Sequence, residues 1–218
     1  MLASDATLRI SEIFFSLQGE SSLAGLPTVF IRLTGCPLRC VYCDTAYAFQ
    51  GGELQTISAI LSGLEKYEVE HVCVTGGEPL AQSECKALLR QLCDQGYQVS
   101  LETSGAMSVA DVDPRVRKIV DMKTPSSGEL KKNDYDNLAL LGELDEVKFV
   151  VNGREDFDWA VRLTSDHALH RTMGSVLISP VYGEQDVQQL ADWVLQSALP
   201  LRFQMQLHKI IWGDVPGV

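Results

Sequence analysis

Three cysteines within eight residues are the clearest chemical feature of the sequence. Cys36, Cys40 and Cys43 lie in a segment over residues 35–45, directly after an apolar stretch. Thiolates that stand this close together on one loop can bind a single iron–sulfur cluster. Electron-transfer clusters normally have four cysteine ligands, so a set of three leaves one iron open to a substrate or cofactor. The triad therefore predicts a catalytic cluster.

Zinc binding and core packing are the alternative interpretations of the cysteines. A structural zinc ion normally has four ligands with paired spacing, and the sequence has no second Cys or His pair at such a distance from the triad. The triad segment also contains Gly, Pro and Arg, which is not typical of a buried core. By contrast, Cys73, Cys85 and Cys93 lie in apolar patterns, where a cysteine acts as a small hydrophobic residue.

Polar residues follow several other apolar stretches of the chain. In residues 75–79 (TGGEP), two glycines allow close approach of the backbone to a ligand. The carboxylate of Glu78 can accept hydrogen bonds from an ammonium group, although a simple Gly-Gly turn is an alternative. Similar polar segments occur over 102–105, 121–123 and 179–182. Taken alone, each of these three is typical of a solvated loop.

The elements that must position these residues alternate between strands and helices. Strands are predicted over 28–34, 70–75, 97–102, 116–121, 146–151, 175–179 and 202–207. Helices are predicted over 56–66, 83–95, 155–167 and 184–198. Several strands are almost wholly apolar, as parallel strands covered on both faces usually are. We expect an α/β fold with a parallel sheet, open or curled into a partial barrel, and ligand sites at its carboxyl edge.

The helix over 83–95 has the clearest pattern of the four. Its apolar residues recur at helical spacing and form one stripe, which consists of Cys85, Leu88, Leu89, Leu92 and Cys93. We expect Ser83 to cap the start of this helix and Gly96 to follow its end.

Length, composition and charge restrict the class of protein. The chain has 218 residues, 45% of them hydrophobic, and without a dividing linker we expect a single domain over 1–218. A net charge of −11 argues against standing roles on nucleic acid or anionic membranes. No apolar stretch approaches the roughly 20 residues that span a bilayer, and residues 1–5 lack a signal-peptide pattern. We therefore expect a cytoplasmic location and free thiols.

The Cys-x3-Cys-x2-Cys spacing resembles the signature of the radical S-adenosylmethionine (SAM) superfamily, and residues 75–79 resemble its GGEP motif. The resemblance implies a [4Fe-4S] cluster on Cys36, Cys40 and Cys43, whose open iron binds the amino and carboxylate groups of SAM. The residues it implies for SAM binding are Tyr42, Cys43, Asp44, Gly77, Glu78, Ser104, Asp121, Met122, Lys123, Ser179, Pro180, Val181 and Tyr182.

The N-terminal segment over 10–20 (ISEIFFSLQGE) narrows the resemblance to the 7-carboxy-7-deazaguanine synthase family. Further similarity covers most of the chain, over 30–33, 36–45, 75–79, 102–105 and 206–209. The resemblance implies an abridged radical SAM (β/α) barrel and a magnesium ion on Thr45. The residues it implies for substrate binding are Leu17, Gln18, Gly19, Glu20, Arg32, Thr75 and His208. Ser21 departs from the family, which often has a glycine there, and the tail over 210–218 is a candidate to close the pocket.

The activity that this resemblance implies is a ring contraction. In the family, a SAM-derived radical removes hydrogen from carbon 6 of 6-carboxy-5,6,7,8-tetrahydropterin, and loss of ammonia gives 7-carboxy-7-deazaguanine, a precursor of queuosine. A homodimer and an electron donor such as a flavodoxin are also implied. Two alternatives stay open, namely a glycyl-radical-enzyme activase and a non-catalytic iron–sulfur or zinc-binding protein. Gln18, Arg32 and Thr45 favour a small carboxylated substrate over the protein substrate of an activase.

Overall fold

Strands and helices alternate along most of the chain, and the computed structural model describes residues 5–213, 215 and 217. The strands are β1 (Thr7–Leu17), β2 (Pro27–Leu33), β3 (Glu53–Thr56), β4 (His71–Gly76), β5 (Gln98–Thr103), β6 (Arg117–Asp121), β7 (Glu146–Val151), β8 (Ser175–Pro180) and β9 (Arg202–Phe203). The helices are α1 (Ile57–Leu64), α2 (Cys85–Asp94), α3 (Arg154–Asp166), α4 (Leu169–Thr172), α5 (Val187–Gln196) and α6 (Leu207–Trp212). Short 3-10 turns, among them η1 (Ala46–Phe49) and η3 (Pro125–Ser127), lie in the connections.

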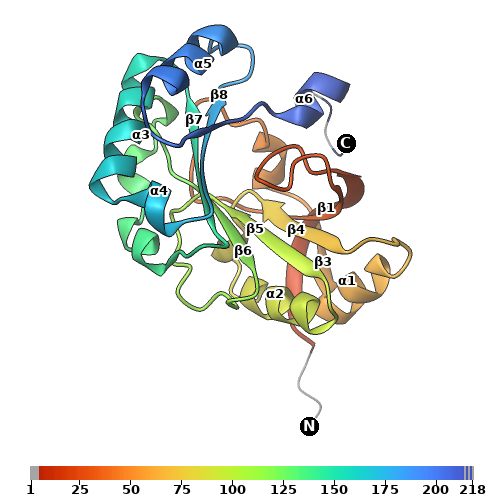
Figure 1. Ribbon diagram of the computed structural model, residues 1–218. Coiled ribbons are helices and arrows are strands. Elements are labelled where there is room, and N and C mark those ends of the chain that lie inside the picture. Colours follow the sequence, from red (N-terminus) through yellow and green to blue (C-terminus); the bar gives the residue numbers. More distant parts are fainter. Residues whose placement is uncertain (1–4, 214, 216, 218) are drawn as a thin grey trace.

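The described strands form one sheet in the order β3-β1-β2-β4-β5-β6-β7-β8-β9. Neighbours from β2 to β9 are parallel, whereas β1 is antiparallel to both β2 and β3. The sheet curves without closing, and α3, α4 and α5 lie along its outside, while α6 stands apart from them (Figure 1). The expected α/β fold, a partial radical SAM barrel with a mainly parallel sheet, is confirmed.

Most of the predicted elements occur, with boundaries that differ by a few residues. β1 and β3 were not predicted, because β1 alternates only in part and β3 is very short. The strand prediction over 202–207 was wrong beyond Phe203, since residues from Leu207 onward form α6. The chain leaves the sheet there because the Leu207 amide donates to the Gly19 carbonyl at 2.9 Å. Tertiary contacts with the turn after β1 therefore override the local strand pattern.

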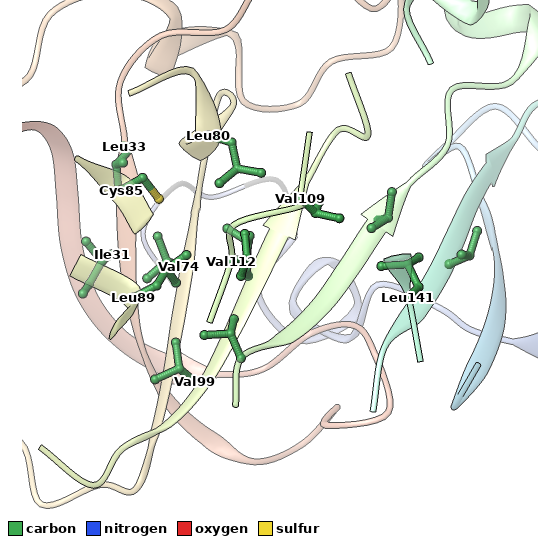
Figure 2. Packing of buried hydrophobic residues seen from close by; sticks show 14 of the residues in the cluster. Ile31, Leu33, Val74, Leu80, Cys85, Leu89, Val99, Val109, Val112 and Leu141 are labelled. Atoms are coloured by element: carbon green, nitrogen blue, oxygen red, sulfur yellow. The ribbon is translucent and has the colours of Figure 1, made fainter. Parts of the chain in front are cut away.

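Helix α2 has the predicted apolar stripe. Figure 2 shows Cys85 and Leu89 among strand side chains that include Ile31 and Val74. All stripe residues are buried except Cys93, which is partly buried against the same core. The predicted cap at Ser83 was wrong: Glu84 occupies the N-cap position and no side chain caps this helix end. Gly96 follows the helix with a φ of +91°, as expected for a left-handed residue after a C-terminus.

This arrangement brings the carboxyl ends of the parallel strands to one edge of the sheet, where β2, β4, β5, β6, β7 and β8 all end. Their interiors are almost wholly buried, so most of the residues that can meet a ligand lie at and beyond the strand ends. No described helix is both long and apolar enough to cross a membrane.

Candidate active site

A cavity of about 410 Å³ lies at the carboxyl edge of the sheet. All but four of the residues that the sequence proposed for cofactor, metal or substrate contribute to its wall. These are Leu17, Gln18, Gly19, Glu20, Arg32, Cys36, Cys40, Tyr42, Cys43, Asp44, Thr45, Thr75, Gly77, Ser104, Asp121, Lys123, Val181, Tyr182 and His208. The structure thus brings segments from both ends of the chain together around one volume.

Four proposed residues lie outside the cavity wall, and these are Glu78, Met122, Ser179 and Pro180. Met122 is fully buried in the core cluster, and Ser179 and Pro180 are buried at the end of β8. Glu78, Met122 and Pro180 each stand next in sequence to a residue that lines the cavity, whereas neither neighbour of Ser179 does so. Glu78 and Met122 are turned into the protein interior, and burial at the end of β8 keeps Ser179 and Pro180 out of the cavity wall.

The carboxylate of Glu78 is bound by the protein itself, which departs from the prediction that it accepts hydrogen bonds from SAM. The Thr103 hydroxyl donates to both of its oxygens at 2.9 Å, and the Ser104 amide donates at 2.7 Å. The Leu80 amide and the Ser104 hydroxyl complete the set. With its side chain fully buried, Glu78 ties the turn after β4 to the end of β5.

Backbone hydrogen bonds fix the cysteine loop against this turn. The Glu78 amide donates to the Gly35 carbonyl at 2.7 Å, and the Gly77 amide donates to Leu33 at 3.1 Å. A Cβ on Gly77 would lie 2.3 Å from the Gly35 oxygen and 2.8 Å from Cβ of Cys36. The close backbone approach that the two glycines predicted is therefore an approach to the cysteine loop.

Tyr42 anchors the far side of the cysteine loop. Its ring lines the cavity, and its hydroxyl donates to the Val150 carbonyl at 3.2 Å and lies 3.1 Å from the Thr124 hydroxyl. Nearby, the Val41 amide donates to Ser127 at 3.0 Å. Burial raises the pKa of Tyr42 well above its ordinary value, so the phenol stays protonated as a donor.

The three cysteines are free and half-buried in the cavity wall, which fits a metal cluster. Burial raises the pKa of all three thiols, and that of Cys40 to about 11, although the Lys123 ammonium acts in the opposite direction. They need a bound metal to become thiolates at neutral pH. Among the described residues, no three or more His, Cys, Asp or Glu side chains are arranged to hold a single metal ion.

A second part of the cavity wall contains a buried ion pair. Lys148 binds Glu20, and Gln206 donates to the second Glu20 oxygen at 2.7 Å. Burial acts to raise the pKa of Glu20, but Lys148, Gln206 and His208 outweigh it and lower that pKa to about 2. Glu102 lies in the same wall, where burial and the charge of Glu20 raise its pKa. The pKa values of these two neighbouring carboxyl groups are therefore shifted in opposite directions.

The turn after β1 packs directly on the start of α6. Gln18 donates to Glu102 at 3.2 Å, and the Thr75 hydroxyl lies 3.5 Å from the same carboxylate. A Cβ on Gly19 would meet Nδ1 of His208 at 2.1 Å, so only glycine fits there without displacing the imidazole. Gln18, Gly19, Thr75 and His208 belong to the predicted substrate set, and together with Glu102 they line the same cavity.

Arg32 and Thr45 make contacts within the protein as well as lining the cavity. Nε of Arg32 donates to Glu12 at 2.7 Å, and the Thr45 hydroxyl donates to Asp44 at 2.7 Å. The ammonium of Lys209 lies 3.6 Å from Asp44 and ties α6 to the cysteine loop. Of the tail over 210–218, residues 214, 216 and 218 lie outside the described residues.

Sequence reasoning did not identify several residues of the cavity wall, among them Phe14, Phe30, Lys148, Gln206 and Lys209. A signal existed for Lys148, since it is a charged residue in the interior of β7, where all its neighbours except Glu146 at the start of the strand are apolar. Phe14 and Phe30 face each other across β1 and β2 with ring centroids 4.9 Å apart. Because β1 was not predicted from the sequence, this pair was not identified.

The cysteine loop, its cavity and the partial barrel define the class of protein. The family model described as "Radical SAM superfamily" matches residues 30–194 of the chain. A 7-carboxy-7-deazaguanine synthase from Chlorobaculum tepidum is 45% identical, with all of both chains covered. One from Koribacter versatilis is 40% identical over 94% of this chain and 97% of its own. The chain belongs to the 7-carboxy-7-deazaguanine synthase family of radical SAM enzymes.

The fold is also that of a solved relative. QueE from Escherichia coli superimposes with a TM-score of 0.76 over 93% of this chain and 95% of its own, at 24% sequence identity. Membership in the family implies a [4Fe-4S] cluster and SAM as cofactors, and does not favour the activase or the non-catalytic metal protein.

Proposed function

We propose that this enzyme converts 6-carboxy-5,6,7,8-tetrahydropterin to 7-carboxy-7-deazaguanine with loss of ammonia, on the route to queuosine and related 7-deazapurines. The names of its full-length relatives support this activity. The observation that carries it is the meeting of the three cysteines, Arg32 and residues 17–20 around one cavity.

The proposed roles follow from where the side chains lie. Cys36, Cys40 and Cys43 would hold the cluster, and Gly77, Ser104 and Lys123 would face SAM. When bound, the reduced cluster and SAM supply the radical that removes hydrogen from the substrate. The protein's part is to bind, orient and shield these groups.

The substrate-binding role belongs to the opposite wall of the cavity. The Arg32 guanidinium can donate two parallel hydrogen bonds to the pterin carboxylate. Gln18 and the ionised Glu20 offer an amide and a carboxylate to the donor-rich pterin edge, and Thr75 and His208 border the same volume. The ion pair with Lys148 would hold the Glu20 carboxylate in place before the substrate arrives.

The proposal also includes magnesium, a partner protein and a location. Thr45 would ligate Mg²⁺ through its hydroxyl oxygen, with substrate oxygens and waters in the remaining positions. The family resemblance supports a homodimer and an electron donor such as a flavodoxin. Free cysteines throughout the described chain support a reducing, cytoplasmic location, and the continuous sheet supports a single domain over 1–218.

The test is anaerobic reconstitution with iron and sulfide, followed by mass spectrometry of the product. Wild-type enzyme with SAM, magnesium, reductant and carboxytetrahydropterin should form 7-carboxy-7-deazaguanine. Cys36→Ala should lose the cluster, SAM cleavage and product together. Cys85→Ala is the matched control, because Cys85 is buried in α2, and it should cost only about 1–3 kcal/mol of stability. SAM cleavage without this product would refute the proposed substrate.

A further inference from the structure

Arg32 stands opposite a carboxylate on the neighbouring strand. In the antiparallel register of β1 and β2, Glu12 pairs with Arg32. Oε1 of Glu12 accepts a hydrogen bond of 2.7 Å from Nε of Arg32. Both side chains are mostly buried, with 16% of the Arg32 side chain and 25% of the Glu12 side chain exposed. The pair is therefore shielded enough to hold a defined geometry.

A tyrosine holds the carboxylate in turn. The hydroxyl of Tyr47, in η1, donates to the same Oε1 of Glu12 at 2.8 Å. The Tyr47 ring lies 5.8 Å from the guanidinium carbon of Arg32, and the Phe14 ring lies 5.6 Å from it. Phe14 is itself fixed by stacking on Phe30. The guanidinium thus has one hydrogen-bonded edge and two aromatic neighbours.

The remaining edge of the guanidinium is available to a ligand. Arg32 lines the cavity, and neither of its Nη atoms has a hydrogen-bond partner among the residues that the structure describes. A guanidinium binds a carboxylate best through two parallel N–H groups in one plane. Fixing Nε on Glu12 sets that plane, because the group is rigid and delocalised.

We propose that Glu12 is a positioning residue for substrate recognition: it orients Arg32, with Tyr47 orienting Glu12, so that the Nη edge selects a carboxylated pterin. The inference rests on the proposed function, because the carboxylate that Arg32 would bind is that of the substrate. The competing explanation is a structural ion pair that only joins β1 to β2. The two differ in whether the acceptor at position 12 governs selectivity for a carboxylate.

Two substitutions at Glu12 separate these explanations. Glu12→Gln keeps an acceptor for Nε and loses the charge, whereas Glu12→Leu loses the acceptor. The readout is the ratio of affinities for 6-carboxytetrahydropterin and for tetrahydropterin without the carboxylate, measured on cluster-replete enzyme with SAM. We expect Glu12→Gln to keep the wild-type ratio within about twofold and Glu12→Leu to lower it about tenfold, the size of one hydrogen bond to a charged group.

Tyr47→Phe keeps the ring and removes the donor to Glu12, so the ratio should fall about two- to fivefold, as for one ordinary hydrogen bond. Cluster content and SAM cleavage without substrate should remain at wild-type levels in all three variants. Glu53→Leu is the matched control, because Glu53 is an exposed strand glutamate on β3 that does not line the cavity. Its ratio should not change.

Two results would overturn the inference. If Glu12→Leu weakens both pterins equally, or leaves both affinities unchanged, the pair is structural. If wild-type enzyme makes no 7-carboxy-7-deazaguanine, the proposed function itself fails, and the positioning role fails with it. Normal product formation by the wild type with an unchanged ratio in Glu12→Leu would refute the positioning role alone.

Discussion

The two walls of the cavity are built in different ways. Main-chain bonds hold the cysteine loop, such as that from Glu78 to Gly35, and its contact with the turn after β4 depends on the absence of a side chain at Gly77. Side chains hold the opposite wall, where Lys148 binds Glu20 from a position 128 residues away in sequence. Backbone groups therefore make much of the contact that holds the cofactor wall, whereas the substrate wall depends on polar pairs between side chains.

This contrast has a consequence for tolerance to substitution. The cofactor wall should be sensitive to added atoms near its backbone, and rather insensitive to changes of exposed side chains. The substrate wall should respond most to the loss of one partner from a buried pair, because the other is then left without compensation. Four substitutions at three places in the cavity wall and its supports test the contrast.

The largest effect on SAM binding is expected for Gly77→Ala. The new Cβ would overlap the carbonyl of Gly35 at 2.3 Å, and only a displaced cysteine loop could accommodate it. Overpacking of this kind costs about 1–3 kcal/mol, so SAM should bind about ten- to a hundredfold more weakly, with reduced cluster content. Iron analysis and SAM titration measure both effects.

The matched control for that variant is Gly63→Ala, at an exposed position near the end of α1 where nothing lies within 4 Å of the new Cβ. It should raise stability by about 0.5–1 kcal/mol through helix propensity, with no change in SAM binding. Normal SAM affinity and iron content in Gly77→Ala would show that the cysteine loop does not depend on this contact.

The largest loss of stability is expected for Lys148→Met, in the wall that holds Glu20. Removing the ammonium leaves Glu20 buried without its cation, and Asp121 loses a second neighbour at 3.5 Å. Breaking such a pair costs about 3–5 kcal/mol of unfolding free energy, which should appear as a lower denaturant midpoint under anaerobic conditions.

Lys86→Met provides the comparison for Lys148→Met, since Lys86 pairs with an aspartate, Asp111, whose side chain is 83% exposed. This surface pair should contribute at most about 1 kcal/mol. If the two variants lose the same free energy of unfolding, the buried pair is no more important than a surface pair. The proposed difference between the two walls would then be wrong.

The smallest effects are expected where the turn after β1 meets the chain after β9. Ser21 has a left-handed φ of +66° and is fully buried. The side chain of Gln204 accepts a hydrogen bond from the Ser21 amide at 2.7 Å and donates one to the Ser21 carbonyl at 2.6 Å. Gln204→Leu would leave the Ser21 amide without a partner and the Ser21 carbonyl with only the Ala24 amide, at 3.3 Å, and should cost about 1–3 kcal/mol.

Ser21→Gly should change stability by less than about 1 kcal/mol, because relief of the left-handed strain offsets the greater freedom of glycine in the unfolded chain. Thermal unfolding of both variants measures this difference. The control is Gln188→Leu, an exposed position on α5. A larger loss in Ser21→Gly than in Gln204→Leu would show that the serine hydroxyl, and not Gln204, holds this turn.

The sequence alone determined the features that depend on near neighbours in the chain. The spacing of Cys36, Cys40 and Cys43 fixed the cysteine loop, and the apolar stripe of α2 and the buried strands specified a mainly parallel sheet. The strand-end segments were also placed at the correct edge, because parallel strands in such folds end on the same side. Position along a strand or helix is a local property, so short patterns reveal it.

The tertiary structure decided what those local patterns leave undetermined. It turned Glu78 away from the cavity to bind the end of β5, and it ended the last strand at Phe203 to pair residues 204–207 with the turn over 18–21. It also placed Lys148 beside Glu20. These outcomes depend on which buried polar groups find partners across the fold. The local sequence around a carboxylate or amide does not reveal which distant group will be its hydrogen-bond partner.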